Sequence, residues 1–245
     1  MTFSHRIERV KGIMGFSGTN REHSCQTGKS PATDGELKET EGSFHPRADA
    51  VTQIFVCGTW RSARAAEYGE QGRSLGQFLA RAGVDLACGP GTGIARHVID
   101  GYRAEPKRGR VRYYLPLRAE MEKVGETVED GADEIVETDF DYPMRNVWQV
   151  KQSHGVFVLT GDEGTLEEVL TAVIDYGLPV AVVDGAGAAS TALRKLVEVY
   201  PWWKDLLRIG PDVQSLAQPF IDHVRATQRA RYGLRDDTTG ADVVA

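Results

Sequence analysis

The chain has 245 residues, of which 41% are hydrophobic, and a formal net charge of -6 at pH 7. This length and content suffice for one sizeable core, so we expect a single α/β domain of roughly 190 residues with tails. The acidic balance and the dispersed basic residues argue against a nucleic-acid partner or an acidic membrane surface, because both require a clustered basic surface.

No apolar run approaches the roughly 20 residues that cross a bilayer. The N-terminus lacks the charged, apolar and small-residue pattern of a secretion signal, so we expect a cytoplasmic protein with no membrane partner. The three cysteines, Cys25, Cys57 and Cys88, are an odd number at spacings that match no zinc pattern. We therefore predict reduced thiols, with neither a disulfide framework nor a metal site.

Composition divides the chain into three parts. Residues 1–50 are rich in Ser, Thr, Gly, Glu and His, and we expect a largely disordered arm there. Residues 51–232 carry the regular apolar pattern of one domain, and residues 233–245 are expected to form a flexible tail.

Within that domain, apolar and β-branched runs alternate with segments of helical spacing. The predicted strands are residues 53–58, 84–88, 111–116, 134–138, 156–159 and 179–184. The predicted helices are residues 65–82, 94–104, 144–153, 165–177, 191–200 and 218–232, with a short polar segment or helix at 119–128. Such alternation implies right-handed crossovers, so we predict a Rossmann-like, doubly wound parallel sheet with helices on both faces.

An aromatic and aliphatic cluster follows the predicted helix at 191–200. It consists of Pro201, Trp202 and Trp203 together with Leu206 and Leu207. We expect this cluster to cover a sheet edge or to meet a partner subunit, because grouped apolar residues of this kind are rarely left in water.

The stretch from Val156 to Glu168 is a buried strand, a glycine turn and the opening of a helix near Thr165. Unpaired backbone amides at a helix start bind anions, and Gly161 and Gly164 would let the backbone turn and approach a ligand. An alternative is that Thr165 and Glu168 form a capping box and only satisfy the helix's own first amides. The residues alone leave both interpretations open.

Ligands of open parallel sheets bind beyond the carboxyl ends of the strands, so the loops at 58–64, 89–93 and 160–165 should converge. The glycine-rich loop at 89–93 does not match G-x-G-x-x-G, and no Walker motif is present. The sequence therefore disfavours a dehydrogenase or an ATPase.

Residues 160–168, Thr-Gly-Asp-Glu-Gly-Thr-Leu-Glu-Glu, resemble the P-G-G-x-G-T-x-x-E signature of the Lonely Guy (LOG) family of nucleoside-monophosphate phosphoribohydrolases. Upstream of it, residues 142–146 resemble the segment that carries the family's catalytic arginine, at matching spacing. The resemblance extends more loosely from about residue 53 to 184 and reaches neither terminus.

This resemblance implies hydrolysis of the N-glycosidic bond of a nucleoside 5′-monophosphate, by a homodimer without metal or organic cofactor. Glu168 would stabilise the oxocarbenium-like sugar or activate water, and Arg145 would hold or polarise the ligand. Without the resemblance, Arg145 would be interpreted as a surface residue at a helix start. The expected substrate-binding residues are Gly58, Thr59, Gly91, Thr92, Gly93, Lys151, Gly161, Asp162, Gly164 and Thr165.

The sequence also departs from the family pattern. Asp162 replaces a glycine, and a carboxylate about 4 Å from a phosphate charge would oppose binding by about 4 kcal/mol at an effective dielectric near 20. Asp162 must then turn away or be offset by Arg61, Arg64 or Lys151, or the ligand has its phosphate elsewhere or none. A second hypothesis is therefore a non-catalytic carrier or sensor of a nucleotide or a molybdenum-cofactor-like ligand.

Overall fold

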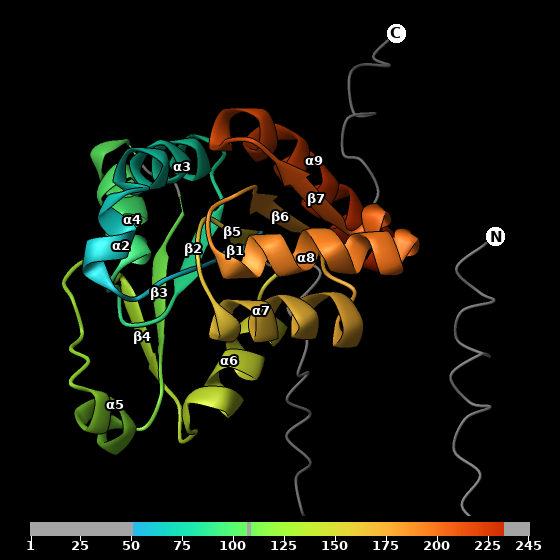
Figure 1. Ribbon diagram of the computed structural model, residues 1–245. Helices are drawn as coiled ribbons and strands as arrows, with labels where there is room; N and C mark the ends of the chain where they lie inside the picture. The colour runs from blue at the N-terminus through green and yellow to red at the C-terminus, as the bar shows by residue number, and fades with distance from the viewer. Residues whose placement is uncertain (1–50, 107–108, 233–245) are drawn as a thin grey trace, which may run out of the picture. The chain divides into compact units, whose positions relative to one another are not determined.

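The strands form one parallel sheet in the order β4-β3-β2-β1-β5-β6-β7. The computed structural model describes residues 51–106 and 109–232 (Figure 1). The arm predicted for 1–50 and the tail predicted for 233–245 lie outside the described residues. The strands are β1 Gln53–Cys57, β2 Asp85–Cys88, β3 Val111–Leu115, β4 Glu134–Glu137, β5 Gly155–Val158, β6 Val180–Val183 and β7 Leu207–Gly210.

Helices cover both faces of this sheet. The α-helices are α2 Ser62–Ala66, α3 Gly69–Arg81, α4 Ile94–Ala104, α5 Arg118–Val124, α6 Tyr142–Lys151, α7 Glu163–Leu170, α8 Ala188–Val199 and α9 Val213–Tyr232. Helices α3, α4 and α9 pack on one face, and α6, α7 and α8 pack on the other (Figure 1). The predicted fold class, a doubly wound parallel α/β sheet, is confirmed.

The central strands are apolar along their whole length because both of their faces are covered. In β1, Ile54 and Val56 belong to the core on the α3 and α4 side, whereas Phe55 and Cys57 belong to the core on the α6 and α7 side. This alternation follows from the two-residue period of a strand. Strand β1 pairs with β2 on one side and with β5 on the other, so it occupies the middle of the sheet.

Apart from helix ends that are shifted by a few residues, the structure differs from the predicted elements in three places. The segment predicted as one helix at 65–82 is two helices, α2 and α3, which meet around Tyr68. Strand β7 was not predicted, because its four residues include the exposed Arg208 and form no apolar run. The aromatic cluster is a 3-10 turn, Pro201–Asp205, that buries Trp203 against the core beside this edge strand.

No helix in residues 51–106 and 109–232 is long and apolar enough to cross a membrane.

Candidate functional site

A cavity of about 370 Å³ opens where β1 lies between β2 and β5, beyond the carboxyl ends of these strands. Its walls come from the loops after β1 and β2, from the end of α5, and from α6 and the start of α7. The three loops expected to converge all contribute to it. This is the switch point of the sheet, where neighbouring strands connect in opposite directions and leave a crevice.

Helix α7 begins at Glu163, two residues earlier than predicted, and Asp162 is its N-cap residue. Thr165 is therefore the third helical residue, so the capping-box interpretation is wrong. Thr165 is buried and lines the cavity, as does Gly164, where a Cβ would meet no atom within 4 Å. The helix thus presents its first amides, which have no partner within the helix, beside open space.

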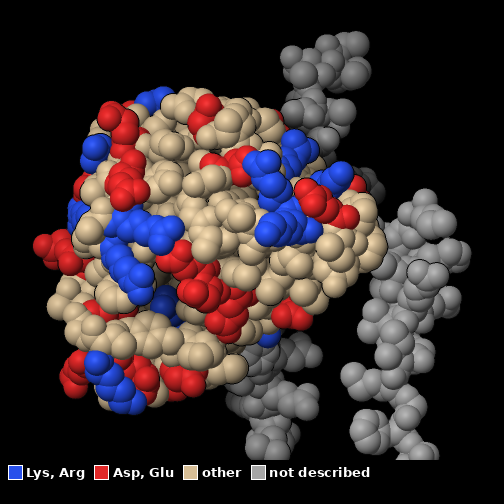
Figure 2. Space-filling view, viewed as in Figure 1, with Lys and Arg blue, Asp and Glu red and all other residues tan. Residues whose placement is uncertain are grey.

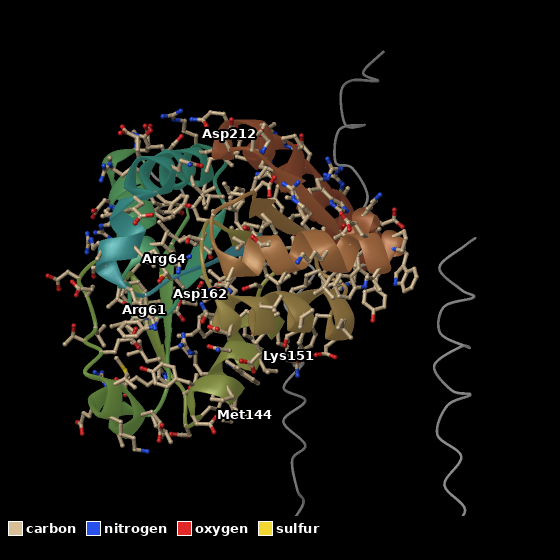
Figure 3. The ribbon with its side chains drawn as sticks, in the orientation of Figure 1. Arg61, Arg64, Met144, Lys151, Asp162 and Asp212 are labelled. Atoms are coloured by element: carbon tan, nitrogen blue, oxygen red, sulfur yellow. The ribbon has the colours of Figure 1, made fainter. Side chains whose placement is uncertain are left out.

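Asp162 is paired rather than isolated at this helix start. Its Oδ2 lies 3.0 Å from Nη1 of Arg64, which belongs to α2. Figure 3 shows these two side chains pointing toward one another, and Figure 2 shows basic and acidic groups meeting on this face. Arg61 also lines the cavity. The partner of Asp162 is therefore Arg64, and the pair has no net charge near the α7 amides.

Arg145 is only 7% exposed, which excludes the surface-arginine interpretation. Asp141 starts α6 by accepting a hydrogen bond from the backbone amide of Met144, and this places Arg145 on the first turn. Its Nη1 donates to the Gln149 side chain at 3.0 Å and to the Tyr114 carbonyl at 3.3 Å. Its buried Nε has no hydrogen-bond partner among the described residues.

Glu168 faces the same cavity from the second turn of α7. Burial raises the pKa of its carboxyl to about 7, against the opposing effect of the nearby Arg145 charge. Cys57, at the end of β1, shares a hydrogen bond with this carboxyl, and burial keeps the pKa of the Cys57 thiol well above its usual value. The thiol is therefore the donor, and Glu168 can exchange a proton near neutral pH.

Most of the residues predicted for the site line this cavity. They are Gly58, Thr59, Gly91, Thr92, Arg145, Asp162, Gly164, Thr165 and Glu168. The others do not line it, namely Gly93, Lys151 and Gly161.

Those three residues have other surroundings. Gly93 and Gly161 have positive φ angles of 60° and 143°, and a Cβ at either position would clash with a neighbouring loop or with Thr165. They shape the loops without facing the cavity. Lys151 ends α6, so it projects to a different side of that helix from Arg145 and lies 5.8 Å from the Trp148 ring. Figure 3 shows it away from Arg64 and Asp162.

The cavity also contains residues that sequence reasoning did not select. Glu126 follows α5 and accepts hydrogen bonds from the hydroxyls of Thr92 and Tyr142. Trp60 and Asn146 line the walls as well. The sequence around Glu126 is polar without a recognisable motif, so nothing in it indicates a site residue. Tyr142 and Asn146 belong to the segment 142–146 that was selected for Arg145.

The arrangement combines anion-binding amides at α7 with a carboxyl of raised pKa and a buried guanidinium. Such a site can hold an anionic ligand while a base or a stabilising carboxylate acts on another part of it. In the part of the chain that the structure describes, no three His, Cys, Asp or Glu side chains are grouped to hold a metal ion.

Comparisons with known proteins agree with this architecture. The sequence model of the SLOG cluster4 family matches residues 51–200. No curated protein matches the sequence.

Among solved structures, the molybdenum cofactor carrier protein of Chlamydomonas reinhardtii is similar at 20% identity and a TM-score of 0.59, over 72% of this chain and 99% of that one. The molybdenum cofactor binding protein of Rippkaea orientalis is similar at 18% identity and a TM-score of 0.53, over 75% and 97%. TM1055 is similar at 23% identity and a TM-score of 0.51, over 59% and 81%. At these identities the likeness establishes the fold.

Proposed function

Since the chain belongs to the SLOG cluster4 family and Arg145 and Glu168 line one cavity, we propose that it hydrolyses the N-glycosidic bond of a nucleoside 5′-monophosphate. The products are the free base and ribose 5-phosphate. The observation that carries this proposal is the Glu168 carboxyl, which faces the cavity beside a buried arginine and has a pKa of about 7. The residue pattern shared with the LOG family supports the same reaction.

The 5′-phosphate would bind at the start of α7. The amides of Gly164 and Thr165 and the Thr165 hydroxyl supply donors there, and the helix dipole favours negative charge. Because Arg64 neutralises Asp162 at 3.0 Å, the repulsion of about 4 kcal/mol expected for an unpaired carboxylate is largely offset. Arg61, on the cavity wall, adds a positive charge.

Glu168 would then act at the sugar. Its carboxylate takes a proton from water as the water oxygen bonds to C1′, and the bond between C1′ and the base nitrogen breaks. The bonding electrons leave with the base, while the developing positive charge on the ribose is stabilised by the carboxylate. The proton that Glu168 received then passes to the base nitrogen, which regenerates the carboxylate. Arg145 would orient the ligand through its guanidinium, since this residue lines the cavity.

The test is release of free base from a panel of nucleoside 5′-monophosphates, separated by chromatography, with wild type beside Glu168→Gln. We expect release by wild type and a loss of about 10³-fold in the variant, with ligand affinity changed less than about threefold. Glu167→Gln is the matched control, because Glu167 is the neighbouring glutamate on α7, is exposed and does not line the cavity. Equal release by wild type and Glu168→Gln would refute the catalytic role.

The second candidate is a carrier or sensor that binds a nucleotide or a molybdenum-cofactor-like ligand without turnover. It is favoured by the likeness in fold to the two molybdenum cofactor proteins. A carrier would release no base from any monophosphate yet would still lose ligand affinity on Arg145→Ala. The predicted homodimer also stays a proposal, and sedimentation equilibrium of the full chain tests it.

A further inference from the structure

The cavity holds a second carboxylate, Glu126, that the proposed hydrolysis does not use. It follows the short helix α5 and lies in the loop before β4, whereas Glu168 belongs to α7. Both line the same cavity, so a ligand held there can meet two acidic groups from different elements.

Glu126 is held in a fixed orientation by two hydroxyls. The Thr92 hydroxyl donates to its Oε1 at 2.9 Å, and the Tyr142 hydroxyl donates to its Oε2 at 2.5 Å. Each carboxylate oxygen has room for about two hydrogen bonds, so each keeps capacity for another donor. The orientation of the Glu126 carboxylate is therefore fixed in the absence of a ligand.

Glu126 also lacks a basic partner. In the described residues, no lysine, arginine or histidine nitrogen lies within 4.0 Å of its carboxylate, unlike Asp162 with its arginine at 3.0 Å. An acceptor group left with open capacity in a cavity is suited to a ligand that brings its own N–H donors.

The surroundings of this carboxylate suit a flat ring. Pro90 and Val124 line the cavity with apolar surface, and Tyr142 contributes its aromatic side chain. The Arg145 guanidinium lies 5.4 Å from the Tyr142 ring centroid, and its buried Nε has no partner among the described residues. The Glu126 carboxylate and Arg145 thus line the same cavity as this apolar wall, as the polar edge and the faces of a nucleobase require.

We propose that Glu126 accepts a hydrogen bond from the exocyclic amino group of the base, so that the cavity selects nucleotides with an amino-bearing base. This inference rests on the proposed function only in taking a nucleoside monophosphate as the ligand, and it holds for a carrier as well as for an enzyme. Replacing the amino group by a carbonyl would place a second acceptor against the carboxylate, leaving both without a hydrogen and repelling one another. A discrimination of about tenfold or more follows.

The experiment measures equilibrium binding by calorimetry for two matched pairs, AMP against IMP and CMP against UMP. Phosphate and ribose are the same within each pair, and the amino and carbonyl forms differ at the position that Glu126 would contact. We expect wild type to bind the amino member at least about tenfold more tightly in one pair or both. Glu126→Gln should abolish or reverse that preference, because an amide can donate to a carbonyl.

Two further variants keep the test decisive. Tyr142→Phe removes one hydroxyl that orients the carboxylate but keeps the ring, so the preference should fall about threefold with the fold intact by circular dichroism. Glu122→Gln removes an exposed glutamate of α5 outside the cavity and should leave the preference unchanged.

Equal affinity for both members of each pair, an undiminished preference in Glu126→Gln, or no binding of any of the four nucleotides would overturn the inference. Base release from the same nucleotides is measured separately, so the two proposals can fail independently. Release without an amino preference contradicts only the role of Glu126. An amino preference without release contradicts only the hydrolysis.

Discussion

The two ends of the parallel sheet use charged side chains in opposite ways. At the amino end, Arg112 of β3 binds Glu134 of β4 at 2.9 Å and lies 3.8 Å from Asp85 of β2. At the carboxyl end, no ion pair in the described part of the chain joins Arg145 to Glu168, and the Arg145 Nε lacks a partner.

This difference separates charges that hold strands together from charges available to a ligand. The Arg112 side chain bridges neighbouring strands and also donates to Gln53, so its bonding capacity is used by the protein itself. Arg145 and Glu168 instead line a cavity, and the Glu168 carboxyl has a raised pKa. Groups with perturbed protonation in a cleft are candidates for function, whereas fully paired groups are candidates for stability.

Removing the carboxyl-end arginine should give the larger functional effect. We expect Arg145→Ala to lower kcat/KM for the best monophosphate by at least about 100-fold, because a buried donor to the ligand is lost. The free energy of unfolding should change by only about 1 kcal/mol. Base-release kinetics and urea unfolding measure the two quantities.

Arg145→Lys is the control for charge, and it should recover only part of the activity because lysine has no planar fork of donors. Full activity in Arg145→Ala would show that Arg145, like Arg112, serves only the stability of the fold, which contradicts the proposed difference between the two ends of the sheet.

Removing the amino-end arginine should do the reverse. Arg112→Ala leaves the buried Asp85 without this cation and Glu134 with only Arg110 at 4.0 Å, so we expect a loss of about 2 kcal/mol in the free energy of unfolding. Turnover should stay within about twofold of wild type, since Arg112 does not line the cavity.

The double variant Arg112→Ala with Glu134→Gln removes one of those carboxylates and should regain part of the lost stability in the same urea titration. A loss of turnover in Arg112→Ala as large as that in Arg145→Ala would show that the charges at the amino end of the sheet also contribute to activity.

The smallest effect concerns pH. The folded pKa of Glu168, about 7, lies above the ordinary value of 4.5, so the folded chain holds this proton more tightly than the unfolded chain. The stability from this proton is therefore complete below pH 4.5 and is lost as pH rises to about 7. Activity should rise over the upper part of that range, because the carboxylate is the acting form.

Unfolding titrations at several pH values, for wild type and Glu168→Gln, measure this difference. The variant should lack the decline, and parallel curves for the two proteins would contradict the raised pKa.

The sequence predicted the sheet well because the strands next to the site are continuous apolar runs with a glycine one or two residues after them. Val156 to Leu159 and Ile54 to Cys57 each show this pattern, and ligand loops follow the strand ends in any sheet of this kind. Arg145 and Glu168 were selected through the resemblance to the LOG family, and both line the cavity.

Contacts between distant segments could not be predicted in this way. Arg64 and Asp162 are 98 residues apart, and three basic residues were equally plausible partners before the fold was known. Glu126 lies in a polar segment with no periodicity, so only the three-dimensional path of the chain brings it to Thr92 and Tyr142. Lys151 does not line the cavity, because helix phase, rather than distance along the sequence, decides which side of α6 a residue faces.

The central position of β1 also bears on how the chain assembles. The strand pairs with β5, and the amide of Gln53 donates to the His154 ring across 101 residues of sequence. Closing so long a loop is slow, and contacts of this separation form late in folding. The α7 wall of the cavity, which includes Glu168, depends on this closure because α7 follows β5. A nascent chain that ends before Gly155 therefore lacks the proposed anion site, and a ligand bound there can stabilise the protein only after β1 and β5 have paired.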